Sequence, residues 1–153
     1  MFQPERLLNG KDAPPPLRAF LAGVLQLEAT DTLVIAKACS TRRGRFKKGV
    51  LALVTEPGGI TNRLGLAKPI YFLTIRGQHY VVAEFYKRLN KTTWRESQTQ
   101  VFLASASQLW MEATCRREGQ DLRVGIPKYF LNECKDPKEV WKEVAGHLNK
   151  LNP

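Results

Sequence analysis

Cationic side chains crowd one short polar segment, where Arg42, Arg43, Arg45, Lys47 and Lys48 fall within seven residues. An arginine guanidinium can hold a phosphate with two parallel hydrogen bonds, and a lysine adds a compact positive charge. Glycine at position 44 tolerates a positive φ, which marks the segment as the tip of a β-hairpin. A hairpin tip projects such side chains away from the core, where phosphates can reach them. The alternative is an ordinary charged turn that keeps the chain soluble.

The positive charge of the chain is concentrated in its middle. The formal net charge is +10, and residues 32–95 hold thirteen Lys and Arg against only Glu56 and Glu84, which makes +11 and leaves −1 for the two flanks. Such segregation costs self-repulsion in the folded state, and an anionic partner offsets that cost. We therefore predict a nucleic-acid-binding protein without catalytic activity, with DNA slightly favoured over RNA. The predicted binding residues are these cations and one tryptophan, namely Lys37, Arg42, Arg43, Arg45, Lys47, Lys48, Arg63, Lys68, Arg76, Lys87, Arg88, Lys91, Trp94 and Arg95.

Aromatic side chains are interleaved with these cations. Unpaired bases stack on such rings where a sheet face is open to solvent. Where a helix covers the face, the same rings are core, and we expect this of most of them. Trp94 lies in a polar stretch, so we expect it to be the exposed exception. The rings concerned are those of Tyr71, Phe72, His79, Tyr80, Phe85, Tyr86 and Trp94.

The residue types that catalyse most enzymatic reactions are sparse. Neither His79 nor His147 has a ligand-spaced neighbour, and the chain has no GxxxxGK[ST] phosphate loop. Cys39, Cys115 and Cys134 include no CxxC pair, which is typical of free structural thiols. We predict no catalytic residues, no metal site and no cofactor.

Two other functions are kept as alternatives. The first is a protein-interaction adaptor that docks an acidic partner. The second is a metal-dependent nuclease, which needs two or three converging carboxylates and a nearby lysine. Glu84 and Lys87 are three residues apart, which on a strand places them on opposite faces. An ion pair between Glu84 and an arginine of the adjacent strand is the favoured interpretation. The other carboxylates on offer are Asp31 and Glu56.

Several broad classes are disfavoured by the composition. No apolar run reaches the eighteen residues that a membrane-spanning helix needs, so we predict no membrane partner. The first ten residues lack the basic patch and apolar run of a secretory signal, which favours a cytoplasmic location. A length of 153 residues fits a single domain, 1–153, in which residues 1–16 are an extended proline-rich segment.

The basic segment has to be positioned by strands. Between residues 32 and 88, β-branched and aromatic residues recur in strand-like runs separated by turn signals. Two hairpins follow, one around the basic tip and one around Gly77-Gln78, and together they predict a four-stranded antiparallel meander. Residues 90–97 are predicted as a loop, and Val101–Leu103 is a candidate further strand. The predicted strands are Thr32–Ser40, Phe46–Val54, Pro69–Arg76, His79–Leu89 and Leu122–Ile126.

Three helices are predicted around this sheet. Apolar residues at three- and four-residue steps predict the first helix near residues 17–28, and the spacing of Leu109, Trp110 and Ala113 predicts the second at 104–118. An N-cap, a first-turn proline and a capping-box glutamate start the third at 137–151. Its apolar face is expected to pack on the sheet or to form a homodimer. The predicted fold class is α+β, an antiparallel β-sheet of about four to six strands flanked by N-terminal, middle and C-terminal helices.

Overall fold

The computed structural model of the chain describes residues 2–55, 64–90 and 92–125, with the backbone alone for residues 3–5. These residues form one ten-stranded sheet, one α-helix and two short 3-10 turns. The predicted fold class, in which three helices flank four to six strands, is therefore wrong. Strands replace the middle helix, and the helix predicted at 137–151 lies outside the described residues.

The sheet is antiparallel at every described strand pair, and it folds back on itself. Its order is β1-β2-β5-β6-β7-β10-β9, with β3 paired to β2, and β4 paired to both β5 and β8. After β7 the chain passes through a 3-10 turn at Ala106–Gln108 into β8, and β8 pairs with β4. The chain thus returns from β7 to the strand β4 on the other side of β5 and β6. The strands are β1 (Phe2–Asn9), β2 (Thr32–Thr41), β3 (Gly44–Lys47), β4 (Ala52–Thr55), β5 (Leu64–Ile75), β6 (Gln78–Arg88), β7 (Thr93–Ser105), β8 (Leu109–Glu112), β9 (Cys115–Glu118) and β10 (Asp121–Val124).

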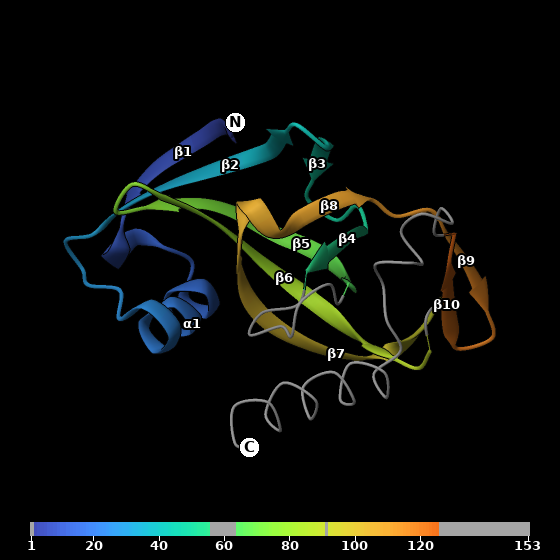
Figure 1. Cartoon of the computed structure of the whole chain (residues 1–153). Coiled ribbons are helices and arrows are strands. Elements are labelled where there is room, and N and C mark those ends of the chain that lie inside the picture. Colours follow the sequence, from blue (N-terminus) through green and yellow to red (C-terminus); the bar gives the residue numbers. More distant parts are fainter. Residues whose placement is uncertain (1, 56–63, 91, 126–153) are drawn as a thin grey trace, which may run out of the picture.

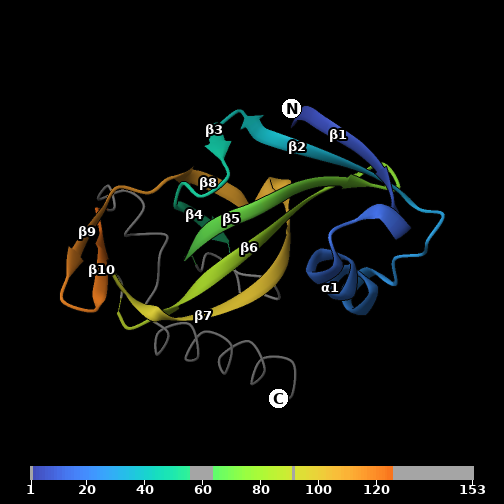
Figure 2. The ribbon, with the colours of Figure 1, turned by 180° about the vertical axis from the view of Figure 1, so that it is seen from behind.

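The long strands β5, β6 and β7 form the twisted centre of the sheet (Figure 1). The helix α1 (Pro15–Leu25) lies at one end of these strands and the β9–β10 hairpin at the other, as Figure 2 also shows from behind. The β2–β3 hairpin lies near β8 on a third side of the molecule. The β2–β3 and β9–β10 hairpins, which both carry charged residues, thus lie at different places on the sheet.

The predicted N-terminal helix is present as α1, with shifted ends. Prolines occupy its first two positions. The N–H groups of these positions make no hydrogen bond within a helix, so proline costs nothing there and the helix starts inside the proline run. It ends at Leu25, and the C-cap residue Gln26 adopts a left-handed conformation with φ 53° and donates its N–H to the Leu21 carbonyl. Leu17 and Leu21 are buried and pack with Leu33 and Ile35 of β2. No described helix is long and apolar enough to cross a membrane.

Both predicted hairpins are present, but their strands are connected differently from a simple meander. The basic tip joins β2 to β3, and the turn Arg76-Gly77 joins β5 to β6. Both residues of the second turn have positive φ, 52° and 77°, as a type I′ turn requires. The strand after the basic tip ends at Lys47, and the later β4 pairs with β5 instead of β2. Consequently β2 lies next to β5 in the sheet.

The helix predicted at 104–118 is wrong, and the loop predicted at 90–97 is wrong from Thr93 onward, where a strand begins. Residues Thr93–Ser105 form β7, and a capping box between Ser105 and Gln108 starts only a single 3-10 turn. The chain then pairs with β4, with Val54 opposite the buried Leu109. A sheet partner thus supplies the backbone hydrogen bonds that a helix would make within itself, and tertiary pairing overrides local helix spacing.

Candidate nucleic-acid interface

The β2–β3 hairpin presents the basic segment as a tight tip. Thr41 pairs with Gly44, which leaves Arg42 and Arg43 as the two turn residues. Gly44 has φ +144°, a conformation that residues with a side chain rarely adopt. The Thr41 hydroxyl accepts a hydrogen bond from the Arg43 backbone N–H at 3.1 Å. These two features fix the turn, so both tip arginines are held at the far end of the hairpin.

Strand alternation decides which hairpin side chains face solvent. Phe46 pairs with Cys39, and both are buried, with 2% and 1% of their surface exposed. Arg45 and Lys47 flank Phe46 and therefore lie on the opposite face, where both are exposed. Burial raises the pKa of the Cys39 thiol, which favours a structural over a reactive role for it.

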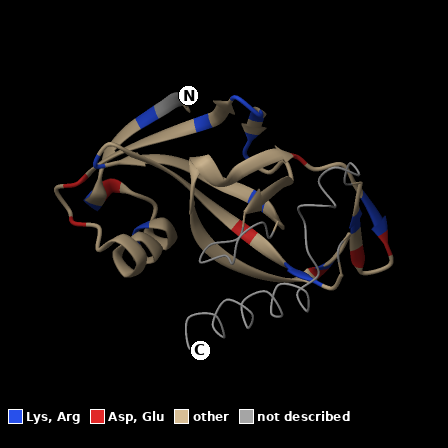
Figure 3. Ribbon diagram, in the orientation of Figure 1, with Lys and Arg blue, Asp and Glu red and all other residues tan. Residues whose placement is uncertain are grey.

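The cations of the hairpin gather in one group, which we name the hairpin cluster. Residues 37–48 contain no Asp or Glu, and in Figure 3 the hairpin ribbon has blue segments for Lys and Arg and no red one. Lys37, Arg42 and Lys47 are exposed and form no ion pair with a described residue. The Lys48 ammonium lies 5.6 Å from the centroid of the Tyr71 ring. The hairpin cluster consists of Lys37, Arg42, Arg43, Arg45, Lys47 and Lys48.

One member of the hairpin cluster contacts the neighbouring strand β8. The Arg43 guanidinium carbon lies 4.4 Å from the centroid of the Trp110 ring, and its Nη1 donates a hydrogen bond to the Leu109 carbonyl at 3.5 Å. Trp110 is half-buried, whereas Arg43 is exposed. Sequence analysis missed Trp110 because it placed this residue on a helix. No local sequence signal marks Trp110 as a strand residue, because its strand β8 forms by pairing with the distant β4.

Three other predicted cations are paired with carboxylates. Cross-strand register places Lys68 opposite Glu84, as expected for a strand-to-strand ion pair, although the partner is a lysine and not an arginine. The structure therefore does not join the predicted residues into one continuous basic surface. The N–O distances are 3.9 Å for Lys68–Glu84, 2.6 Å for Arg76–Asp31 and 3.0 Å for Arg95–Asp121.

The expectation that Trp94 is exposed is wrong. Its side chain is fully buried, with 0% exposure, and Leu122 of β10 pairs directly opposite it. The guanidinium of Arg88 covers its ring at 5.1 Å and donates hydrogen bonds to the carbonyls of Asn90 and Leu64. The polar stretch around Trp94 forms the start of β7, which lies between β6 and β10. Arg88 and Trp94 thus stabilise this end of the sheet.

The remaining predicted residues add little to a common surface. Lys87 is exposed on β6, whereas Arg63 and Lys91 lie outside the described residues. Most of the interleaved aromatic rings are core, as expected, and His79 is exposed, with its Nδ1 2.8 Å from the Thr74 hydroxyl. Burial raises the pKa of the Tyr86 hydroxyl. The buried rings are Phe72, Phe85, Tyr86 and Trp94, and those partly buried are Tyr71 and Tyr80.

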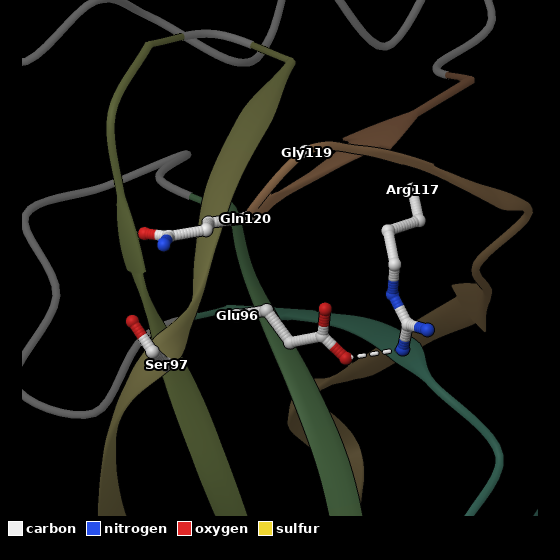
Figure 4. Close-up of a pocket in the computed structure, with 5 residues that line it drawn as sticks. All are labelled: Glu96, Ser97, Arg117, Gly119 and Gln120. Carbon is white, nitrogen blue, oxygen red and sulfur yellow. Dashed lines mark hydrogen bonds and ion pairs between the residues drawn. The ribbon is translucent and has the colours of Figure 1, made fainter.

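The β9–β10 hairpin holds a second group of arginines, but acids accompany them. Arg116 donates a hydrogen bond to the Glu118 carboxylate and thereby lowers its pKa, and Arg123 lies 3.5 Å from the same group. Figure 4 shows the ion pair between Arg117 and Glu96. Both residues line a shallow depression of about 460 Å³. A polyanion would have to displace these carboxylates, which makes the hairpin cluster the better candidate.

The described residues offer little to the catalytic alternatives. No group of three or more His, Cys, Asp or Glu able to hold a metal ion occurs among them. Asp31 is held by Arg76, Glu84 faces Lys68, and Glu56 lies outside the described part of the chain. No protein-family model, curated protein or solved structure matches the chain.

Proposed function

We propose that this protein binds nucleic acid and that the hairpin cluster contacts the phosphate backbone. The observation that carries the proposal is the arrangement of exposed cations at one hairpin, within a segment that contains no acidic residue. On β9 and β10, by contrast, the exposed arginines stand beside carboxylates. Like charges that gather in a segment without any carboxylate are accounted for by a partner of opposite sign.

The rigid tip supports the same proposal. Thr41 and Gly44 fix the turn, and Phe46 anchors β3 in the core. A phosphate contact therefore requires little ordering of the backbone, which lowers the entropic cost of binding. Arg42, Arg45 and Lys47 are the residues best placed to reach phosphates, because all three are exposed on this anchored hairpin.

Salt dependence tests whether phosphate is the ligand. Affinity of the full chain for a fluorescein-labelled oligonucleotide should be measured by anisotropy at several salt concentrations. Three phosphate contacts predict a slope of log affinity against log salt of about −2 for a single strand and about −2.7 for a DNA duplex. Affinity that does not respond to salt contradicts the proposal.

A pair of charge-matched variants tests whether the hairpin cluster is the site. The triple variant Arg42→Ala, Arg45→Ala, Lys47→Ala should bind at least tenfold more weakly and lose most of the slope. The control triple variant changes net charge equally but removes arginines that already face carboxylates, so it should bind nearly as well as the wild type. An equal loss in the two variants would show attraction by net charge alone. The control substitutions are Arg116→Ala, Arg117→Ala and Arg123→Ala.

An acidic protein partner remains the rival that the same assay can detect. Polyglutamate should be added as a competitor at equal charge concentration. Under the proposal it displaces the oligonucleotide only weakly, because a guanidinium fork also recognises the tetrahedral phosphate group and not charge alone. Displacement as efficient as that by unlabelled DNA would favour the acidic-partner function instead.

A further inference from the structure

Arg43, at the tip of the hairpin, lies over an aromatic ring of another strand. Two contacts fix the Arg43 guanidinium: its carbon lies 4.4 Å from the Trp110 ring centroid, and Nη1 reaches the Leu109 carbonyl at 3.5 Å. Trp110 is itself held by the pairing of β8 with β4 and packs against the buried cluster around Leu53. The guanidinium is therefore pre-positioned by the sheet, unlike that of its exposed neighbour Arg42.

The Trp110 ring covers one side of the Arg43 guanidinium, and the Arg43 residue as a whole is exposed to solvent. The Arg43 side chain is exposed, and no described carboxylate pairs with it. Unpaired bases stack on guanidinium planes as they do on aromatic rings. In a duplex each base is already stacked and paired, so only an unpaired base can use such a plane without first breaking the helix.

We propose that the Arg43 guanidinium, backed by Trp110, is a stacking plate for one unpaired base, so that the ligand is single-stranded nucleic acid. This inference rests on the proposed function, because it assigns the phosphates of the same strand to Arg42, Arg45 and Lys47. Stacking on the plate places a base at the hairpin tip while the backbone follows the exposed face of β3. The plate carries no base-edge recognition, so any base should be accepted.

The test compares two single strands of equal length and charge, one of thymidines and one of abasic sites. The full-length protein should bind the thymidine strand at least about fivefold more tightly than the abasic strand, and a duplex of that length no better than the abasic strand. Arg43→Lys keeps the charge but removes the planar group, so it should abolish the difference between the two strands. Arg42→Lys, at the other tip position, should leave the difference unchanged.

The outcomes separate this inference from the function on which it rests. If Arg42→Lys and Arg43→Lys lose the thymidine preference equally, or if both retain it, the proposal that Arg43 stacks on a base is wrong. Salt-dependent binding in the same experiment would still support the phosphate contact. Failure of the wild-type protein to bind either strand in a salt-dependent manner would overturn both. Circular dichroism spectra that match the wild type establish that each variant is folded.

Discussion

Arg76 donates hydrogen bonds to both carboxylate oxygens of Asp31, at 2.6 and 3.2 Å, across 45 residues of sequence. The same guanidinium donates to the carbonyls of Leu25 and Gln26, where α1 ends. A cation at this position satisfies carbonyls that a helix C-terminus leaves without partners. Arg76 therefore joins the β5–β6 turn to the end of α1 through these four hydrogen bonds.

We expect Arg76→Ala to lower the free energy of unfolding without weakening oligonucleotide binding. The substitution removes the ion pair between the β5–β6 turn and Asp31, and it changes no residue of the hairpin cluster. Urea unfolding and anisotropy on the same sample measure the two effects. Lys87→Ala, an exposed cation on the next strand, is the control and should change neither quantity. A loss of affinity in Arg76→Ala together with a shallower salt slope would show that Arg76 contacts phosphate and would contradict this separation of roles.

The same ion pair predicts how stability depends on pH. Hydrogen bonds from Arg76 and from the Glu28 N–H lower the pKa of Asp31 below its ordinary value of 3.8. The unfolded chain therefore takes up this proton at a higher pH than the folded chain does. The contribution is fully present above about pH 4 and is lost as the pH falls through the lower folded-state value.

Asp31→Asn should remove that part of the acid sensitivity. Urea midpoints measured between about pH 2 and pH 6 should fall less steeply for the variant than for the wild type in the acidic range. Glu118, whose pKa is also lowered by its arginine neighbour, contributes equally to both proteins, so the difference between the curves isolates Asp31. Parallel curves would show that the Asp31 pKa is the same in both states.

Local signals in the sequence predicted the parts of the fold that depend on near neighbours. Gly44 and Gly77 mark two turns, and both have the positive φ that their hairpins need. The apolar spacing before Leu25 predicted α1 for a similar reason, since helix contacts are local. The strand β8 could not be predicted in this way, because its backbone partner β4 is more than fifty residues away and Leu109 has the same apolar character in either structure.

The candidate site was predicted where it depends on one hairpin and missed where it depends on distant pairing. The clustering of Arg42 and Lys47 follows directly from their separation in sequence. By contrast, the acid that neutralises Arg95 is Asp121, on a strand 26 residues later. Trp94 became core because Leu122 of that same strand lies opposite it. Segment charge counts cannot register such pairings, because they ignore which strands become neighbours.

Gly44→Ala is expected to lower the free energy of unfolding by about 1–3 kcal/mol. A Cβ at this position would contact nothing within 4 Å, so the cost comes only from φ +144°, which residues with a side chain avoid. Gly23→Ala is the matched control. Gly23 lies within α1 with equally open space around it, and alanine there should raise stability by up to about 1 kcal/mol. Chemical denaturation of both variants measures the contrast, and equal effects would contradict it.

Trp94 provides a test of the interior of the sheet. Its ring is fully buried, yet no hydrogen-bond acceptor for its Nε1 is found among the described residues. An unpaired buried donor costs about 1–3 kcal/mol, so Trp94→Phe removes a penalty together with part of the packing. We expect it to cost under about 2 kcal/mol, against about 3–5 kcal/mol for Trp94→Ala.

The control for this prediction is Phe72→Leu. This substitution also makes a fully buried aromatic side chain smaller, but it removes no polar atom. Since both substitutions delete a comparable volume, Phe72→Leu should be the more destabilising of the two by roughly the cost of the unpaired donor. Unfolding by guanidinium chloride gives both values under one condition. If Trp94→Phe proves as costly as Phe72→Leu, the indole N–H has an acceptor in solution, such as an ordered water, and its burial carries no penalty.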